Sequence, residues 1–135
     1  MSHSATETEV RSWFDEYVQT FVRCAGSKSG DAEPLQKYIH TPFSLATDDM
    51  FLVLGSREEV ARMLGHELTQ LARSNYGGST AIEPTLQVIN RRAAVIAVTW
   101  SRTDQSGAEF QRLRVSYWVV KTDAGWRMTS SAVHK

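Results

Sequence analysis

The chain has 135 residues, of which 41% are hydrophobic and 22% are charged, as is typical of one soluble globular domain. Its 15 lysines and arginines balance its 15 aspartates and glutamates, so the formal net charge is zero. This balance, without any run of basic residues, argues against nucleic acid or an anionic membrane as a partner. We expect a single domain over residues 1–135.

Cysteine usage and the N-terminal residues narrow the class of protein further. Cys24 is the only cysteine, which excludes an internal disulfide and a cysteine-rich metal site. Residues 1–10 lack a basic stretch followed by an apolar run, and no apolar run in the chain approaches about 20 residues. We therefore expect a cytoplasmic protein with no signal peptide and no transmembrane helix.

The first part of the chain has helical periodicity. Apolar residues recur at helical spacing from Val10 to Val22, which predicts a long amphipathic helix. A glycine-containing polar segment ends this helix. A short helix is expected next, with Asp31 as its N-cap and Pro34 near its first turn. Two short extended segments around a turn at residues 47–49 follow.

A third helix is predicted from a capping box, in which Ser56 and Glu59 have the required spacing. Its apolar stripe is expected to be buried, and its charged residues, Glu67 among them, are assigned to the solvent-facing side. The sequence NYGG at residues 75–78 ends the helix. A glycine there is expected to supply the positive φ angle that helix ends require.

From Ile82 onward the hydrophobic alternation changes to a period of two. Short turns join the segments, and such turns require antiparallel pairing of the strands. Helices followed by a long antiparallel meander define an α+β fold. The four predicted strands cover residues 82–90, 93–104, 109–122 and 125–134.

The tight turns predict which side chains share a face of the sheet. Counting from the turn at residues 106–107 places Trp100 opposite Leu113 and Ile96 opposite Tyr117, on the core face. The first strand of the meander fits this face only with a three-residue turn at residues 90–92 or with a bulge.

The turn at residues 124–125 predicts the pairing of the last hairpin. It places Val119 opposite Ser130 and Tyr117 opposite Ala132, which predicts that Trp126, Met128, Ser130, Ala132 and His134 face the core. Trp118 belongs to the outer face, together with small hydroxyl residues. Because an exposed face of this mixture is unusual, we expect a homodimer that forms through the outer sheet face.

The order of these elements, with YWVVKT followed by a strand that begins GWRM, resembles the NTF2-like superfamily and within it the SnoaL-like proteins of bacteria. The resemblance spans about Thr8 to His134. It implies a cone in which three N-terminal helices pack on a strongly curved antiparallel or mixed β-sheet, with an apolar pocket at its mouth. The superfamily includes isomerases, dehydratases, cyclases, epoxide hydrolases and pure binding domains, so the fold does not fix the function.

The resemblance allows known chemistries of the superfamily to be compared with these residues. Ketosteroid isomerase uses a tyrosine, a carboxylate base and a protonated carboxylic acid. Tyr17 matches the tyrosine, but Leu45 or Ala46 falls at the base and Tyr117 at the acid, which argues against this activity.

Other family chemistries match only in part. The Asp-Arg-Asp relay of limonene epoxide hydrolase is met by Arg102 alone. A dehydratase of the scytalone type would use histidines, for which His40 and His134 are available.

Two classes of function remain open. The first is a pocket that binds a small organic molecule, with or without acid–base catalysis of the isomerase, dehydratase or cyclase type. The second is a non-catalytic dimerisation or interaction module that uses the outer sheet face. No cofactor is expected, and no metal, because the spacing offers no ligand cluster. The candidate catalytic residues are Tyr17, His40 and Asp48, and the candidate ligand-binding residues are Trp13, Trp100, Arg102, Tyr117, Met128, Ser130 and His134.

Overall fold

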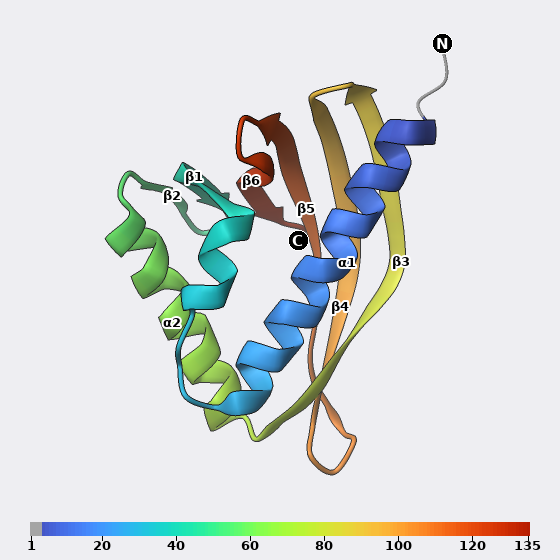
Figure 1. The fold of residues 1–135 in the computed structure, drawn as a ribbon. Helices are drawn as coiled ribbons and strands as arrows, with labels where there is room; N and C mark the ends of the chain where they lie inside the picture. The colour runs from blue at the N-terminus through green and yellow to red at the C-terminus, as the bar shows by residue number, and fades with distance from the viewer. Residues whose placement is uncertain (1–3) are drawn as a thin grey trace.

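The N-terminal apolar pattern forms the long helix α1 (Ser4–Ser27), which crosses the concave side of a curved sheet (Figure 1). The computed structural model describes residues 4–135. Val10, Phe14, Tyr17 and Phe21 lie on the buried side of α1, at the spacing that the sequence predicts. Burial of this stripe against the sheet and the remaining helices forms one hydrophobic core.

The predicted short helix is a 3-10 helix, η1 (Glu33–Tyr38), and its N-cap residue is Ala32. The expected cap, Asp31, lies one residue earlier. Its Oδ1 still accepts a hydrogen bond from the backbone N–H of Glu33 at 3.0 Å. The assignment of the cap position was therefore wrong by one residue, although the side chain satisfies a backbone donor at this helix end, as a cap does.

The capping box of helix α2 (Arg57–Arg73) is confirmed. The backbone N–H of Glu59 donates to Ser56 Oγ at 3.1 Å, and Ser56 Oγ donates to Glu59 Oε1 at 3.2 Å. The prediction for the C-terminal end of this helix was wrong, because Asn75 rather than a glycine takes the positive φ angle, 57°. Gly77 is required for a different reason, since a Cβ atom there would lie 2.4 Å from the carbonyl oxygen of Asp104.

Six strands form one mixed sheet in the order β2-β1-β6-β5-β4-β3. All neighbouring strands are antiparallel except β1 and β6, which are parallel. The first strand of the meander starts at Tyr76, well before the predicted residue 82. The strands are β1 (Ile39–Ala46), β2 (Phe51–Leu54), β3 (Tyr76–Asn90), β4 (Ala93–Asp104), β5 (Glu109–Thr122) and β6 (Gly125–Val133).

The predicted register of the central hairpin is confirmed, with Trp100 opposite Leu113 and Ile96 opposite Tyr117. The first strand of the meander also fits as predicted. Leu86 lies opposite Ile96, and a register shift between Val88 and Asn90 supplies the expected bulge.

The predicted register of the last hairpin is wrong. Val119 pairs with Met128 and the preceding Trp118 pairs with Ser130, so Thr129 is an extra residue on β6. A bulge of this kind exchanges the two faces of the strand beyond it. Met128 therefore remains in the core, whereas Ser130 shares the outer face with Trp118.

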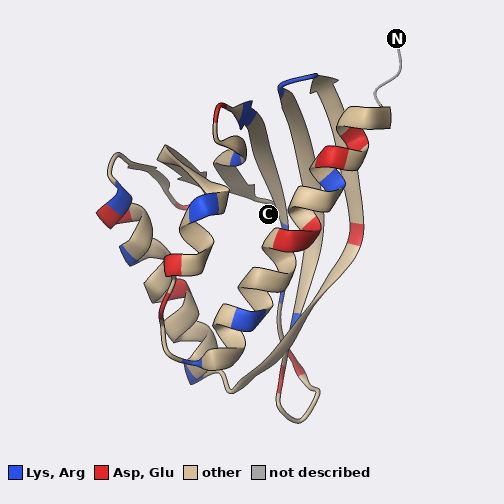
Figure 2. Ribbon diagram, in the orientation of Figure 1, with Lys and Arg blue, Asp and Glu red and all other residues tan. Residues whose placement is uncertain are grey.

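Charged residues of both signs occur along α1 and α2 and also in the strands and turns of the sheet, as the colours of the ribbon in Figure 2 show. No helix among residues 4–135 is both long enough and apolar enough to cross a membrane. The charged side chains among residues 4–135 are in general not buried. Arg102 is the clearest exception, because it is only 7% exposed.

Candidate functional site

A small cavity of about 120 Å³ lies inside the curved sheet, between α1, α2 and the inner faces of β1, β4, β5 and β6. Its walls are largely apolar, with Phe43, Leu64 and Met128 as examples. Polar side chains from five elements of the fold line it as well. These are Tyr17 of α1, Glu67 of α2, Arg102 of β4, Tyr117 of β5 and Ser131 of β6.

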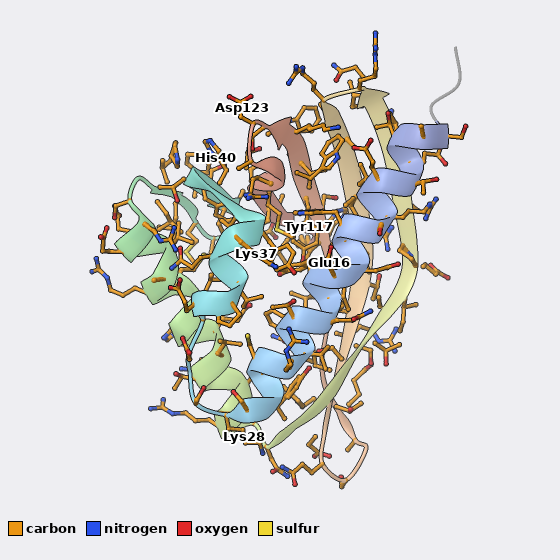
Figure 3. All side chains as sticks on the ribbon, viewed as in Figure 1. Glu16, Lys28, Lys37, His40, Tyr117 and Asp123 are labelled. Carbon is orange, nitrogen blue, oxygen red and sulfur yellow. The ribbon has the colours of Figure 1, made fainter. Side chains whose placement is uncertain are left out.

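Two buried tyrosines form one wall of the cavity. Tyr17 lies on the apolar stripe of α1, and Tyr117 lies at an inward position of β5, behind α1 in Figure 3. Their ring centroids are 6.3 Å apart in an edge-on arrangement. Trp100 Nε1 donates a hydrogen bond to the Tyr117 hydroxyl oxygen at 2.9 Å. This bond satisfies the indole donor and fixes the position of the phenol.

Burial raises the pKa of both phenols well above the ordinary value for tyrosine. For Tyr17 the neighbouring Tyr117 adds to this rise. Both side chains are consequently neutral over the physiological pH range, because the charged form is disfavoured where water is excluded. They can provide hydrogen bonds to a ligand without acting as bases.

Arg102 brings a buried cation to the cavity without a carboxylate partner. Its Nη1 donates to Gln111 Oε1 at 2.8 Å, and its Cζ lies 5.1 Å from the centroid of the Phe21 ring. Its Nε is buried and has no hydrogen-bond partner. None of the ion pairs formed within residues 4–135 involves Arg102. Burial of such a group is costly unless an anion or acceptor completes its coordination.

Glu67 supplies a carboxyl group at the mouth of the cavity. It lies one helical turn after Met63 on α2, and both residues line the cavity. The residue as a whole is exposed, with its side chain at the rim of the cavity. Burial raises the pKa of Glu67, and the positive charge of Arg102 opposes that rise. Because water still reaches the rim, we expect a smaller rise than for a fully enclosed acid.

Five of the candidate residues are brought together by the fold, since Tyr17, Trp100, Arg102, Tyr117 and Met128 all line the cavity. They come from α1, β4, β5 and β6, and they share the inner face of the sheet or the buried stripe of the helix. This grouping supports one continuous site. Whether they bind a ligand stays a prediction.

Trp13 lies behind this group and does not line the cavity. Its ring stacks on Tyr17 with the centroids 6.5 Å apart, and it meets Tyr38 edge-on at 6.0 Å. It packs against the core as a partly buried residue. The structure therefore gives Trp13 a supporting position behind Tyr17.

His40 and Asp48 lie away from the cavity. His40 Nδ1 lies 3.1 Å from the carbonyl oxygen of Pro42, and the side chain borders a separate external groove between α1, η1 and the β5–β6 turn (Figure 3). Asp48 lies in the turn between β1 and β2, with Oδ2 3.8 Å from Lys135 Nζ. Neither side chain can act on a molecule held by Arg102 from these positions.

Ser130 and His134 were predicted to face the cavity, and the bulge in β6 overturns this prediction. His134 Nε2 lies 2.7 Å from Ser116 Oγ, which belongs to the outer face of β5. Ser131 and Val133 take the inward positions instead and line the cavity. The same bulge thus removes two candidate residues from the site and adds two others.

Glu67 is the site residue that sequence reasoning missed. A charged residue on an amphipathic helix is normally solvated, and this explanation was applied to Glu67. Its position four residues after Met63, at the border of the apolar stripe, was the available signal. Within residues 4–135, no group of three or more histidine, cysteine, aspartate or glutamate side chains is placed to hold a metal ion.

Comparison with known proteins gives a family match over almost the whole chain. A family model described as "NTF2-like protein (DUF6841)" matches residues 7–135. No curated protein matches the chain.

Solved structures agree with the family match at the level of the fold. A protein of Streptomyces avermitilis described as a "putative dehydratase from the NTF2-like family" has a TM-score of 0.70 and 16% identity, over 98% of this chain and 96% of that one. An NTF2-like protein of unknown function from Shewanella oneidensis has a TM-score of 0.69 and 11% identity, over 93% and 98%. An NTF2-like protein with a cystatin-like fold from Novosphingobium aromaticivorans has a TM-score of 0.68 and 17% identity, over 96% and 80%. At these identities the likeness shows the fold alone.

The raised pKa of Glu67 predicts a pH-dependent stability. Below the ordinary glutamate pKa of about 4.3, both the folded and the unfolded states hold the proton and no penalty arises. As the pH rises from there through the folded-state pKa, the unfolded state releases its proton first, so the native protein loses stability. Glu67→Gln should therefore gain stability relative to the natural protein over this window, with a constant difference above it.

Urea unfolding at a series of pH values from mildly acidic to neutral measures this difference. Glu16→Gln, which removes the same charge from the exposed side of α1, controls for the change in net charge. A stability difference between Glu67→Gln and the natural protein that stays constant over the whole series would contradict the assigned environment of Glu67.

Proposed function

This chain is an NTF2-like protein of the DUF6841 family, and on that premise we propose that it binds a small organic molecule in the internal cavity and performs acid–base chemistry on it. The observation that carries the proposal is the buried guanidinium of Arg102, whose Nε lacks a partner and which borders the cavity. A ligand oxygen that is anionic or strongly polarised would complete its coordination. Arginine binds carboxylate oxygens well, because its donors form a planar fork.

In this proposal the two tyrosines and Arg102 hold the ligand, and Glu67 transfers the proton. The neutral phenols of Tyr17 and Tyr117 donate or accept hydrogen bonds at the apolar end of the cavity. A raised pKa lets the Glu67 carboxyl group hold its proton to a higher pH than a free glutamate does, which suits a group that exchanges protons with a ligand. Nearby positive charge stabilises the oxyanion that forms when a proton leaves the carbon next to a carbonyl.

The reaction class that fits these roles is proton abstraction next to a carbonyl group, as isomerases and dehydratases require. Tyr17, a candidate catalytic residue in the sequence, forms a hydrogen bond to the ligand in this proposal. His40 and Asp48 have no role in this proposal, because both lie outside the cavity. Glu67 takes the place of the carboxylate base for which the sequence offered Asp48.

Binding and proton transfer can be separated with one probe, 2-oxobutanoate, which has a carboxylate and exchangeable protons on C3. NMR in D2O measures both its affinity and its C3 deuterium exchange. Arg102→Met should weaken binding about tenfold or more, because a charge-assisted hydrogen bond is lost. Glu67→Gln should slow exchange about 100-fold or more while binding persists, the usual contribution of one acid–base group.

Arg112→Met is the matched control, since Arg112 is exposed on β5 and pairs with Glu109 at 2.9 Å. It should leave both measurements unchanged. Equal loss in Arg102→Met and Arg112→Met would overturn the binding role. Exchange no faster than in buffer would overturn the catalytic role and leave a binding domain.

A second candidate function, interaction through the outer sheet face, is favoured by Trp118. This residue is 39% exposed at the outer side of β5, where a large aromatic side chain is unusual. We propose that two copies of the chain pair through this face. Sedimentation at micromolar concentration should give the mass of a dimer, and Trp118→Arg should give that of a monomer. A monomeric natural protein would exclude this interface.

A further inference from the structure

The cavity is too small to hold a complete organic ligand. Its volume is about 120 Å³. Ligand pockets generally measure about 300–1,000 Å³, and a buried cavity of roughly 150 Å³ holds one benzene molecule. If the proposed function is correct, this space takes only the polar head of the ligand, and the remainder lies elsewhere.

A second, larger space adjoins the cavity, with charged and polar side chains of α2 on one side and apolar side chains on the other. It is a groove of about 580 Å³ between α2 and the hairpin formed by β1 and β2, two elements that lie next to each other in Figure 1. Leu45, Met63 and Glu67 line both the cavity and the groove. These three residues, which we call the neck, form the boundary between the two spaces.

The groove is apolar on its hairpin side. Met50, Leu52 and Leu54 line it, and Met50 and Leu52 are 49% and 39% exposed. Phe51 and Val53, at the alternate positions of the same strand, are exposed but do not line the groove. The strand alternation thus presents one apolar side chain in two to this space, and these side chains continue the apolar surface of Leu45 and Met63 outward from the neck.

From this arrangement we propose that the ligand is an amphipathic carboxylate: its anionic head binds Arg102 in the cavity, and its apolar chain passes the neck and lies in the groove between α2 and β2. The inference rests on the proposed function and names the substrate class. It explains why the cationic end of the site is buried while the exposed apolar side chains gather at its exit. The three neck residues, which line both the cavity and the groove, are what identifies the occupant of the groove.

The test is a binding series of straight-chain carboxylates from butanoate to decanoate, each below its micellar concentration, with tryptophan fluorescence as the readout because Trp100 lines the cavity. Once the chain is long enough to pass the neck, affinity should rise up to about fourfold for each added methylene group. Affinity that does not depend on chain length would overturn the inference, even where butanoate binds in an Arg102-dependent manner. That outcome would leave the proposed function intact. If the natural protein does not bind butanoate, both this inference and the proposed function are contradicted.

Leu52→Asp and Val53→Asp form a matched pair on one strand. Leu52→Asp should weaken decanoate binding at least tenfold and leave butanoate binding unchanged, and Val53→Asp should change neither. Met50→Asp, nearer the hairpin turn, repeats the test if Leu52→Asp does not fold. If Leu52→Asp and Val53→Asp weaken decanoate binding equally, the ligand adsorbs to the hairpin surface and the inference is overturned. A dimer that Leu52→Asp converts to a monomer would also overturn it, because the groove would then be covered by a second copy of the chain.

Discussion

The burial of one cation, Arg102, is the constraint on which the rest of the site depends. Its position on β4 directs the side chain inward, where Gln111 and the Phe21 ring hold the guanidinium and no carboxylate pairs with it. An arginine stays charged there, and the hydrogen-bond acceptors and π-electron density of its surroundings stabilise the charge. The Nε donor has no hydrogen-bond partner. The protein therefore keeps a buried guanidinium at a position where an apolar side chain would pack at a lower cost in free energy.

The other features of the site follow from this placement. The pKa of Glu67 reflects two opposed effects, burial that raises it and the charge of Arg102 that lowers it. The tyrosines stay neutral because α1 excludes water from them, and the Trp100 indole holds Tyr117 in place. The result is a cavity with a cation, neutral hydrogen-bonding groups and one titratable acid at its mouth, the combination that acid–base chemistry on a carbonyl compound requires.

The fold was largely predictable from the sequence because its signals are local or periodic. The apolar stripe of α1 placed Tyr17 inward, and the tight turn at residues 106–107 set Trp100, Arg102 and Tyr117 on one face of the sheet. The capping box set the start of α2. Each of these depends on neighbouring residues or on strand register, which the chain encodes directly.

The errors in the site arise where local patterns carry no information. Nothing in the alternation of β6 reveals that Thr129 is an extra residue, so Ser130 and His134 were placed on the wrong face. Glu67 looks like any solvated helix residue until tertiary packing sets α2 beside the mouth of the cone. His40 was available to a dehydratase of the scytalone type, but it lies at the start of β1 and borders an external groove. These positions are decided by contacts between distant segments.

The stability of Arg102→Met without ligand tests the central claim most directly. If Arg102 is a ligand-binding group that the apo protein holds at a cost, the apolar substitution should be neutral or should raise the free energy of unfolding by about 1–4 kcal/mol, the range found when buried ion pairs are replaced by apolar residues. Urea unfolding of the two proteins at neutral pH measures the difference. A decrease in the free energy of unfolding of roughly 3 kcal/mol or more, the size expected when a buried polar network is broken, would contradict this account. It would show that Arg102 stabilises the fold and is not held there to bind an anion.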